Sequence, residues 1–166
     1  MEKYKALKDK VILAVDDEED VLDTLAEMLD MCIVHKAKDY DTASEYLLSY
    51  TYDIVILDIM GVNGFELLKL AVTRDFPTVM LTAHAVTPEA LKKSIKLGAV
   101  FFLPKEQISD LREFLEEVVL NEGKSIWVKL FDRLGDFFNK RFGPDWKEKD
   151  RFFKEFEESL KKDQSA

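Results

Sequence analysis

Residues 11–18 read VILAVDDE and residues 53–58 read DIVILD, so that two short apolar runs each end in acidic residues. Three further runs are likewise short and nearly all apolar or β-branched. The five predicted strands are Val11–Val15, Cys32–Ala37, Ile54–Leu57, Thr78–Leu81 and Ala99–Leu103. Runs of this kind are typical of strands that are buried on both faces of a parallel sheet.

Amphipathic segments separate these runs and predict helices. The segment from Thr87 to Gly98 has a capping threonine, a proline at the first helical position and a closing glycine. Gly123 is expected to end the fifth helix. Five repeats of strand and helix predict an α/β fold with a doubly wound, five-stranded parallel sheet. Right-handed crossovers would place the ligand site at the carboxyl ends of the strands.

The composition changes after Gly123, and we predict two parts: residues 1–123 and an amphipathic helical extension, residues 124–166. The second part holds 7 of the 12 Phe and both Trp. It reads as a helical hairpin interrupted at Gly143-Pro144, with Asp145 and Glu148 as a capping box for the second helix. The large apolar residues of its stripes are Trp127, Leu130, Phe131, Leu134, Phe137, Phe138, Phe152, Phe153, Phe156 and Leu160.

These stripes are too large to stay in water, because each large apolar side chain gains about 1.5–3 kcal/mol on burial. The hairpin is therefore expected to dock on the first part or to form a symmetric dimer interface. A membrane surface is a weaker alternative, because acidic residues lie among the lysines of its polar face.

Charge and cysteine content exclude several classes of protein. Residues 1–123 carry 13 Lys and Arg against 24 Asp and Glu, whereas residues 124–166 carry 11 against 9. The net charge of residues 1–123 is therefore −11, which has the wrong sign for binding nucleic acid. No direct nucleic-acid binding is expected. No apolar run approaches the ~18 residues of a membrane span. The single cysteine, Cys32, excludes an internal disulfide and fits a cytoplasmic location.

Acidic, hydroxyl and basic residues converge at the predicted carboxyl edge of the sheet. Asp16 and Asp17 follow the first strand, and Asp58 follows the third. Neighbouring carboxylates repel each other, and a divalent cation relieves this; an all-oxygen site suits Mg²⁺. The fourth strand ends at Thr82 and the fifth at Lys105. A metal and a lysine neutralise phosphoryl oxygens while a carboxylate attacks, so this set predicts phosphoryl chemistry.

The arrangement resembles the receiver domain of two-component response regulators over roughly residues 9–121. The matching segments are Val15-Asp16-Asp17-Glu18, Leu57-Asp58-Ile59-Met60 with Gly64-Phe65-Glu66-Leu67-Leu68, Leu81-Thr82-Ala83-His84, and Gly98 to Lys105. The resemblance implies a flavodoxin-like sheet with a phosphoacceptor at Asp58. It also implies the remaining site residues: Mg²⁺ held by Asp16, Asp17, Asp58 and the Met60 carbonyl, phosphate contacts from Thr82 and Lys105, and switch residues Thr82 and Phe102.

The resemblance further implies a role and partners. The chain would be a bacterial, cytoplasmic phosphoprotein that receives its phosphoryl group from a sensor histidine kinase or a phosphotransfer protein. Phosphorylation would change its contacts with a protein effector, or its self-association through the helical extension. It would not be an enzyme beyond gaining and losing its own phosphoryl group.

Two departures from the family pattern are visible. The segment from Asp58 to Gly64 is about two residues shorter than usual and lacks the proline that normally follows the position of Met60. Glu106, rather than proline, follows Lys105.

Three other interpretations stay open. The first is an atypical receiver that takes no phosphate and acts as a constitutive interaction module. The second is a Mg²⁺-dependent phosphatase with an aspartate nucleophile; such enzymes usually carry a second aspartate two residues later, where this chain has Met60. The third takes Asp16, Asp17 and Glu18 as nothing more than helix-capping acids.

Overall fold

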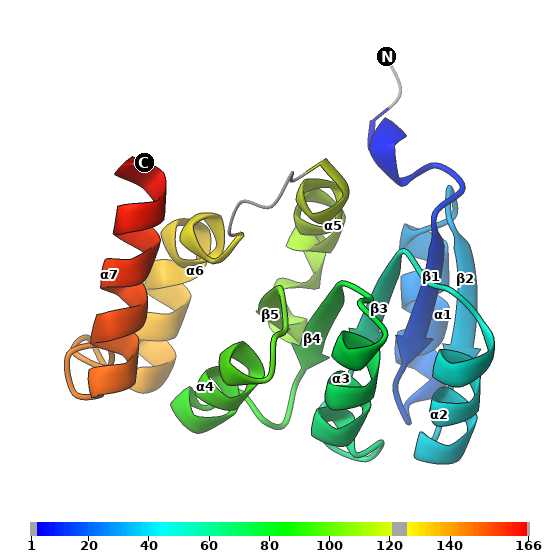
Figure 1. Ribbon diagram of the computed structural model, residues 1–166, viewed down its shortest axis with the longest axis horizontal. Helices are drawn as coiled ribbons and strands as arrows, with labels where there is room; N and C mark the ends of the chain where they lie inside the picture. The colour runs from blue at the N-terminus through cyan, green and yellow to red at the C-terminus, as the bar shows by residue number, and fades with distance from the viewer. Residues whose placement is uncertain (1–2, 121–125, 166) are drawn as a thin grey trace.

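A five-stranded parallel sheet forms the centre of the protein, whose computed structural model describes residues 3–120 and 126–165 (Figure 1). The strand order is β2-β1-β3-β4-β5, the doubly wound order of flavodoxin-like folds. This confirms the predicted fold class. The strands are β1 (Val11–Val15), β2 (Ile33–Ala37), β3 (Ile54–Leu57), β4 (Thr78–Thr82) and β5 (Phe101–Pro104).

Helices cover both faces of the sheet, with α2, α3 and α4 on one side and α1 and α5 on the other (Figure 1). The predicted start of α4 is confirmed, because Thr87 Oγ1 accepts a hydrogen bond from the Ala90 N–H at 3.1 Å. The helices are α1 (Glu19–Met28), α2 (Tyr40–Ser49), α3 (Gly64–Thr73), α4 (Pro88–Lys96) and α5 (Leu111–Leu120), with 3-10 turns η1 (Lys5–Leu7) and η2 (Lys105–Asp110).

The last strand begins two residues later than predicted and includes Pro104. The Ala99 N–H donates to the Ser94 carbonyl at 3.0 Å, so Ala99 still completes the end of α4. Proline fits in β5 because this strand lies at the edge of the sheet, where a missing N–H is tolerated. The predicted start of β2 at Cys32 is also one residue early.

The two edges of the sheet differ in exposure. In β2, Ile33 and Lys36 are exposed, whereas every residue of β5 is buried. The helices α6 (Trp127–Phe142) and α7 (Arg151–Ser165) lie on the β5 side, beyond α4 and α5 (Figure 1). These two helices confirm the predicted helical extension, and they pack against the rest of the chain. Its buried apolar residues join the same continuous core as the sheet: Ile126, Trp127, Leu130, Leu134, Phe138, Trp146, Phe153 and Leu160.

The predicted capping box at Asp145 and Glu148 is wrong. Gly143, with φ of +99°, ends α6, and residues 144–149 form turns rather than helix. The cap of α7 is Asp150, whose Oδ1 accepts a hydrogen bond from the Phe152 N–H at 2.8 Å. The buried Trp146 keeps the turns on α6, because its indole N–H donates to Asn139 Oδ1 at 3.0 Å.

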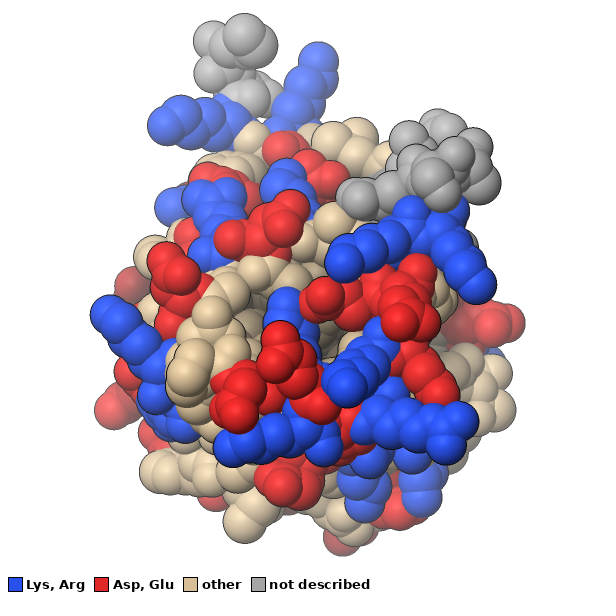
Figure 2. Space-filling view, turned by 90° about the vertical axis from the view of Figure 1, so that its left-hand side faces the viewer, with Lys and Arg blue, Asp and Glu red and all other residues tan. Residues whose placement is uncertain are grey.

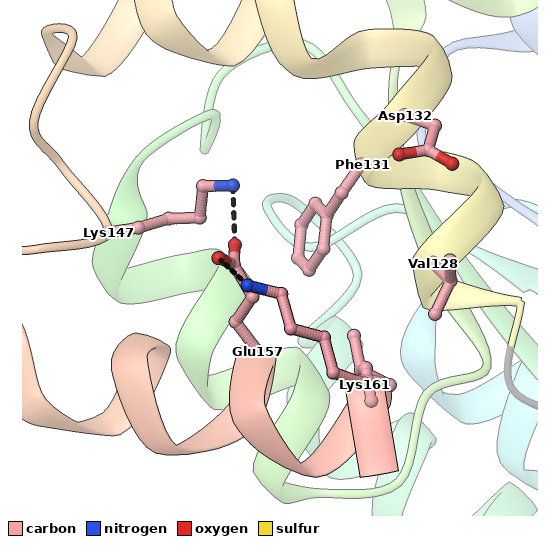
Figure 3. Close-up of a pocket in the computed structure, with 7 residues that line it drawn as sticks. Val128, Phe131, Asp132, Lys147, Glu157 and Lys161 are labelled. Carbon is pink, nitrogen blue, oxygen red and sulfur yellow. Dashed lines mark hydrogen bonds and ion pairs between the residues drawn. The ribbon is translucent and has the colours of Figure 1, made fainter. Parts of the chain in front are cut away.

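Charged side chains link the turns after α6 to α7. Figure 3 shows Glu157 of α7 between Lys147 and Lys161, beside a surface cavity of about 280 Å³ that Phe131 also lines. Lys147 Nζ lies 2.6 Å from Glu157 Oε2, and Lys161 Nζ lies 3.6 Å from Oε1. The hydrogen bond from Lys147 lowers the pKa of Glu157. Figure 2 shows acidic and basic side chains interspersed over the face on which the extension lies.

The boundary predicted between residues 123 and 124 lies outside the described residues, as does the helix end predicted at Gly123. The last described residue of α5 is Leu120, and α6 begins at Trp127. Among the helices of residues 3–120 and 126–165, none combines the length and the apolar character that crossing a bilayer requires.

The single cysteine is expected to react slowly. Cys32 Sγ donates to the Leu7 carbonyl at 3.2 Å, and burial raises the pKa of its thiol to about 11, helped by the charge of Asp30. Because the thiolate is the nucleophile, alkylation by iodoacetamide at pH 8 should be at least about tenfold slower in the folded protein than in urea. Equal rates in the two conditions would contradict this placement of Cys32.

Candidate functional site

Three buried polar residues meet at the carboxyl edge of the sheet, as predicted. Val15 pairs with Leu57 in the parallel register of β1 and β3, which places Asp16 and Asp58 side by side. The Asp58 N–H donates to the Val15 carbonyl at 3.0 Å. Asp16 and Asp58 are 2% and 3% exposed, and Thr82, at the end of β4, is fully buried.

Lys105 lies between the two buried aspartates. Its Nζ is 2.8 Å from Asp16 Oδ2 and 3.5 Å from Asp58 Oδ2. Burial by itself would lower the pKa of Lys105, but its hydrogen bond to Asp16 and the charge of Asp58 outweigh burial, so the pKa is raised. The ammonium therefore stays charged and balances part of the negative charge at this edge.

Asp58 has an unfavourable environment for a carboxylate. Burial raises its pKa, and the negative charge of Asp16 raises it further; Lys105 and a hydrogen bond from the Ile59 N–H act in the opposite direction. That hydrogen bond reaches Oδ1 at 2.9 Å, while Oδ2 faces Lys105. A carboxylate that is held in place but poorly stabilised is a reasonable nucleophile.

The Thr82 hydroxyl has no hydrogen-bond partner of normal geometry among the described residues. It lies close enough to Asp58 to lower the pKa of that carboxyl. Buried hydroxyls are nearly always hydrogen-bonded, because an unmatched one costs about 1–3 kcal/mol. An unmatched hydroxyl beside Asp58 indicates a place for an oxygen-bearing ligand.

The acidic residues form a group that differs in part from the predicted metal set. Carboxylate oxygens of Asp16, Asp17 and Glu18 lie within 4.8 Å of one another, and Asp58 is not in this group of described residues. Lys105 bridges Asp58 and Asp16. Asp16 Oδ1 also accepts from the Glu18 N–H at 2.9 Å, so it caps the approach to α1 as well. These oxygen donors fit Mg²⁺, a hard cation.

The short loop after Asp58 brings two glycines against the acidic residues. At Gly61, with φ of +86°, an added Cβ would lie 2.4 Å from Asp17 Oδ2. At Gly64 it would lie 1.9 Å from the Asp58 carbonyl oxygen. No role was predicted for either glycine, although a glycine close in sequence to an acidic residue is a signal of close backbone approach.

The remaining predicted site residues are Met60 and Phe102, and His84 lies in one of the matching segments. The Met60 residue is 54% exposed, on the same loop. Phe102, the predicted switch residue, is fully buried in β5, where it pairs with Met80. His84 is exposed, and its Nε2 lies 3.9 Å from Glu18 Oε1.

Comparison with known proteins agrees with this geometry. The protein-family model of the response regulator receiver domain matches residues 12–116. The two-component response regulator ARR10 of Arabidopsis thaliana is 34% identical over 65% of this chain, and the match covers 21% of that protein. The phosphate regulon transcriptional regulatory protein PhoB of Klebsiella pneumoniae is 29% identical over 69% of this chain and 59% of its own length. The chain thus matches only part of each relative.

Solved structures share the fold. The chemotaxis protein CheY4 of Vibrio cholerae is 27% identical, with a TM-score of 0.60 over 66% of this chain and 98% of its own. TrrA of Thermotoga maritima, solved in complex with Mg(2+)-BeF, is 28% identical, with a TM-score of 0.58 over 66% of this chain and 98% of its own. From the matched family model, the sheet order and the residues at its carboxyl edge, we conclude that the chain belongs to the response regulator receiver domain family.

Proposed function

We propose that the protein carries a signal as a phosphoryl group on Asp58. The observation that supports this most directly is the surroundings of the Asp58 carboxylate: it is buried, 3.5 Å from Lys105 and beside the unmatched Thr82 hydroxyl. In the proposed reaction an Asp58 oxygen attacks the phosphorus of the donor, the bond from phosphorus to the donor breaks, and an aspartyl phosphate remains.

Two side chains are placed to stabilise the transferred group. Lys105 can leave Asp16 and pair with a phosphoryl oxygen, because its flexible side chain already reaches both aspartates. Thr82 can donate its hydroxyl proton to another phosphoryl oxygen, which would satisfy a group that otherwise stays unmatched. The proposed switch is a movement of Thr82 toward the phosphoryl group. The other switch residue, Phe102, is buried in β5, the strand next to β4, which ends at Thr82.

Asp16 and Asp17 would hold Mg²⁺, together with Asp58 and the Met60 carbonyl. A bound Mg²⁺ supplies positive charge that offsets the negative charge of the carboxylates and of the phosphoryl oxygens. The presence of Mg(2+)-BeF in the similar TrrA supports this assignment. Asp17 and Glu18 are both exposed at the entry to α1, and Asp17 lies against Gly61 of the loop after Asp58.

Asp17 is expected to contribute more than Glu18 to Mg²⁺ affinity. The Gly61 backbone packs against Asp17 and restricts its carboxylate, while Glu18 can turn to solvent. Asp17→Asn should weaken Mg²⁺ binding about tenfold or more, and Glu18→Gln less than about threefold. Titration of amide chemical shifts with Mg²⁺ measures both. Equal weakening by the two substitutions would contradict the assignment of Asp17.

Incubation with acetyl phosphate tests the function itself. Intact-mass spectrometry should show one added phosphoryl group per native chain when Mg²⁺ is present, and much less when a chelator replaces it. The Asp58→Asn protein should gain none under either condition. If native and Asp58→Asn proteins are labelled equally, Asp58 is not the acceptor.

The donor and the receiver of the signal follow from the same proposal. A sensor histidine kinase or a phosphotransfer protein would supply the phosphoryl group in the cytoplasm of a bacterial cell. A protein effector, or a second copy bound through the helical extension, would respond to it. No activity on other substrates is proposed beyond self-phosphorylation and self-dephosphorylation.

One observation favours a second candidate, a receiver that is not phosphorylated. The Lys105 ammonium already pairs with Asp16, a proposed metal ligand, at 2.8 Å. If this pair were permanent, Mg²⁺ would not bind, and the protein would act as a constitutive interaction module. Absence of Mg²⁺-induced shifts at Asp16 and Asp17, together with no phosphoryl adduct, would establish this alternative. The phosphatase alternative is less favoured, since the exposed Met60 has no acid–base group.

A further inference from the structure

Basic residues of α6 reach acidic residues of η2 and α5, and thereby connect the helical extension to the segment that carries Lys105. The basic residues are spaced by four and eight positions along α6. The pairs are Lys129–Glu117, Arg133–Asp110, Arg133–Glu113 and Arg141–Glu106.

Both ends of the η2 turn are held by this arrangement. The turn runs over six residues from Lys105 to Asp110. At its far end Asp110 lies 3.4 Å from Arg133 Nη2. At its near end Glu106, directly after Lys105, pairs with Arg141. Glu106 occupies the position at which this chain departs from the usual lysine–proline pattern, so the departure creates the contact.

The contact leads in a few steps to the acceptor site. Arg141 pairs with Glu106, Glu106 is joined by a peptide bond to Lys105, and the Lys105 ammonium contacts Asp16 and Asp58. The Lys105 side chain is 12% exposed, so a shift of its backbone would change which oxygens the ammonium reaches.

We propose that Arg141 is a positioning residue for Lys105 and acts through Glu106. The inference rests on the proposed function of Asp58. Exposed ion pairs contribute little to the stability of a fold, but they can fix where a turn lies. A charged group that must meet a transferring phosphoryl group depends strongly on such placement. By thermodynamic linkage, a change in the partners of Lys105 must also change the contact of α6 with η2.

Rates of phosphorylation by acetyl phosphate with Mg²⁺ provide the main test, with the adduct measured by intact mass. Arg141→Ala should lower the rate about three- to tenfold. Lys129→Ala is the matched control, because it breaks an ion pair of the same extension away from Lys105, and its rate should stay within about twofold of native. The charge exchange Glu106→Arg with Arg141→Glu should restore most of the lost rate.

Two further measurements separate positioning from a general effect on the fold. In a Lys105→Ala background, Arg141→Ala should have no additional effect on the rate, because the two residues act in series. In amide NMR spectra taken without Mg²⁺ or phosphodonor, Arg141→Ala should shift the amide signals of Asp16 and Asp58. Lys129→Ala should leave those signals in place.

The outcomes distinguish this inference from the proposed function. If native protein gains no phosphoryl group, both are wrong. If native protein is labelled and Arg141→Ala behaves like Lys129→Ala, the positioning role is contradicted while Asp58 stays the acceptor. If Arg141→Ala lowers the phosphorylation rate as much in the Lys105→Ala background as in the native protein, the positioning role is contradicted as well.

Discussion

Replacement of Phe138 by alanine is expected to lower the free energy of unfolding by about 3–5 kcal/mol, the usual cost of a buried Phe→Ala substitution. The Phe138 residue is fully buried. Its ring centre lies 5.5 Å from that of Phe142, 5.9 Å from Trp146 and 6.3 Å from Phe131. Alanine would leave a cavity among large rings that cannot all move to fill it.

Phe137→Ala is the matched control, since Phe137 is the neighbouring residue of the same type but only partly buried. Its substitution should cost about 1 kcal/mol. Urea unfolding followed by tryptophan fluorescence reports on the extension, because both tryptophans lie there. Far-UV circular dichroism reports on the whole chain.

The two probes should give one coincident transition in the native protein, because the extension and the sheet share a core. Phe138→Ala should move both probes to lower urea. A shift of the fluorescence transition alone, with the circular dichroism midpoint unchanged, would show that the extension is not part of the cooperative fold.

Asp58→Asn is expected to stabilise the protein at pH values above the raised pKa of Asp58, against the usual direction of single substitutions. Folding raises the pKa of Asp58, first through burial and then through the charge of Asp16. The folded chain therefore binds the proton of this carboxyl more tightly than the unfolded chain does. Stability is lost as the pH rises from the usual pKa of about 3.9 through the raised value. The penalty is thus fully present once the pH exceeds the raised pKa, and asparagine removes it.

Thermal unfolding measured at several pH values tests whether Asp58→Asn stabilises the protein. The difference between the Asp58→Asn and native melting temperatures should grow as the pH rises through the raised pKa of Asp58, and should shrink below about pH 4, as Asp58 becomes protonated in both the folded and the unfolded chain. Asp132→Asn, an exposed position of α6, should change stability by less than about 0.5 kcal/mol. A native protein more stable than Asp58→Asn at pH 7 would show that ionised Asp58 is stabilised by its neighbours.

The fold and the members of the site were predictable from local sequence. Apolar runs that end in acidic, hydroxyl or basic residues specify strands and their carboxyl ends, and parallel pairing then gathers Asp16, Asp58, Thr82 and Lys105 at one edge. The start of α4 was predictable for a similar reason, because Thr87 and Pro88 act through contacts only a few residues away.

The individual side-chain pairings between distant segments were not predictable. Sequence alone gave no way to choose between Asp16 and Asp58 as the nearer partner of Lys105, because the choice depends on distances across the sheet. The pairing of Arg141 with Glu106 joins residues 35 positions apart. The cap of α7 was misplaced because the packing of Trp146 on α6 overrides the local signal of Asp145.

Chemical trapping of the labelled residue tests the central claim most directly. Borohydride reduces an acyl phosphate to an alcohol, so that a phosphorylated aspartate becomes homoserine, which peptide sequencing by mass spectrometry locates in the chain. After treatment with acetyl phosphate and Mg²⁺, we expect homoserine at position 58 in the native protein and little of it when Mg²⁺ is chelated. Homoserine at Asp16 or Asp17 instead, or at no position, would contradict the assignment of Asp58 as the phosphoacceptor.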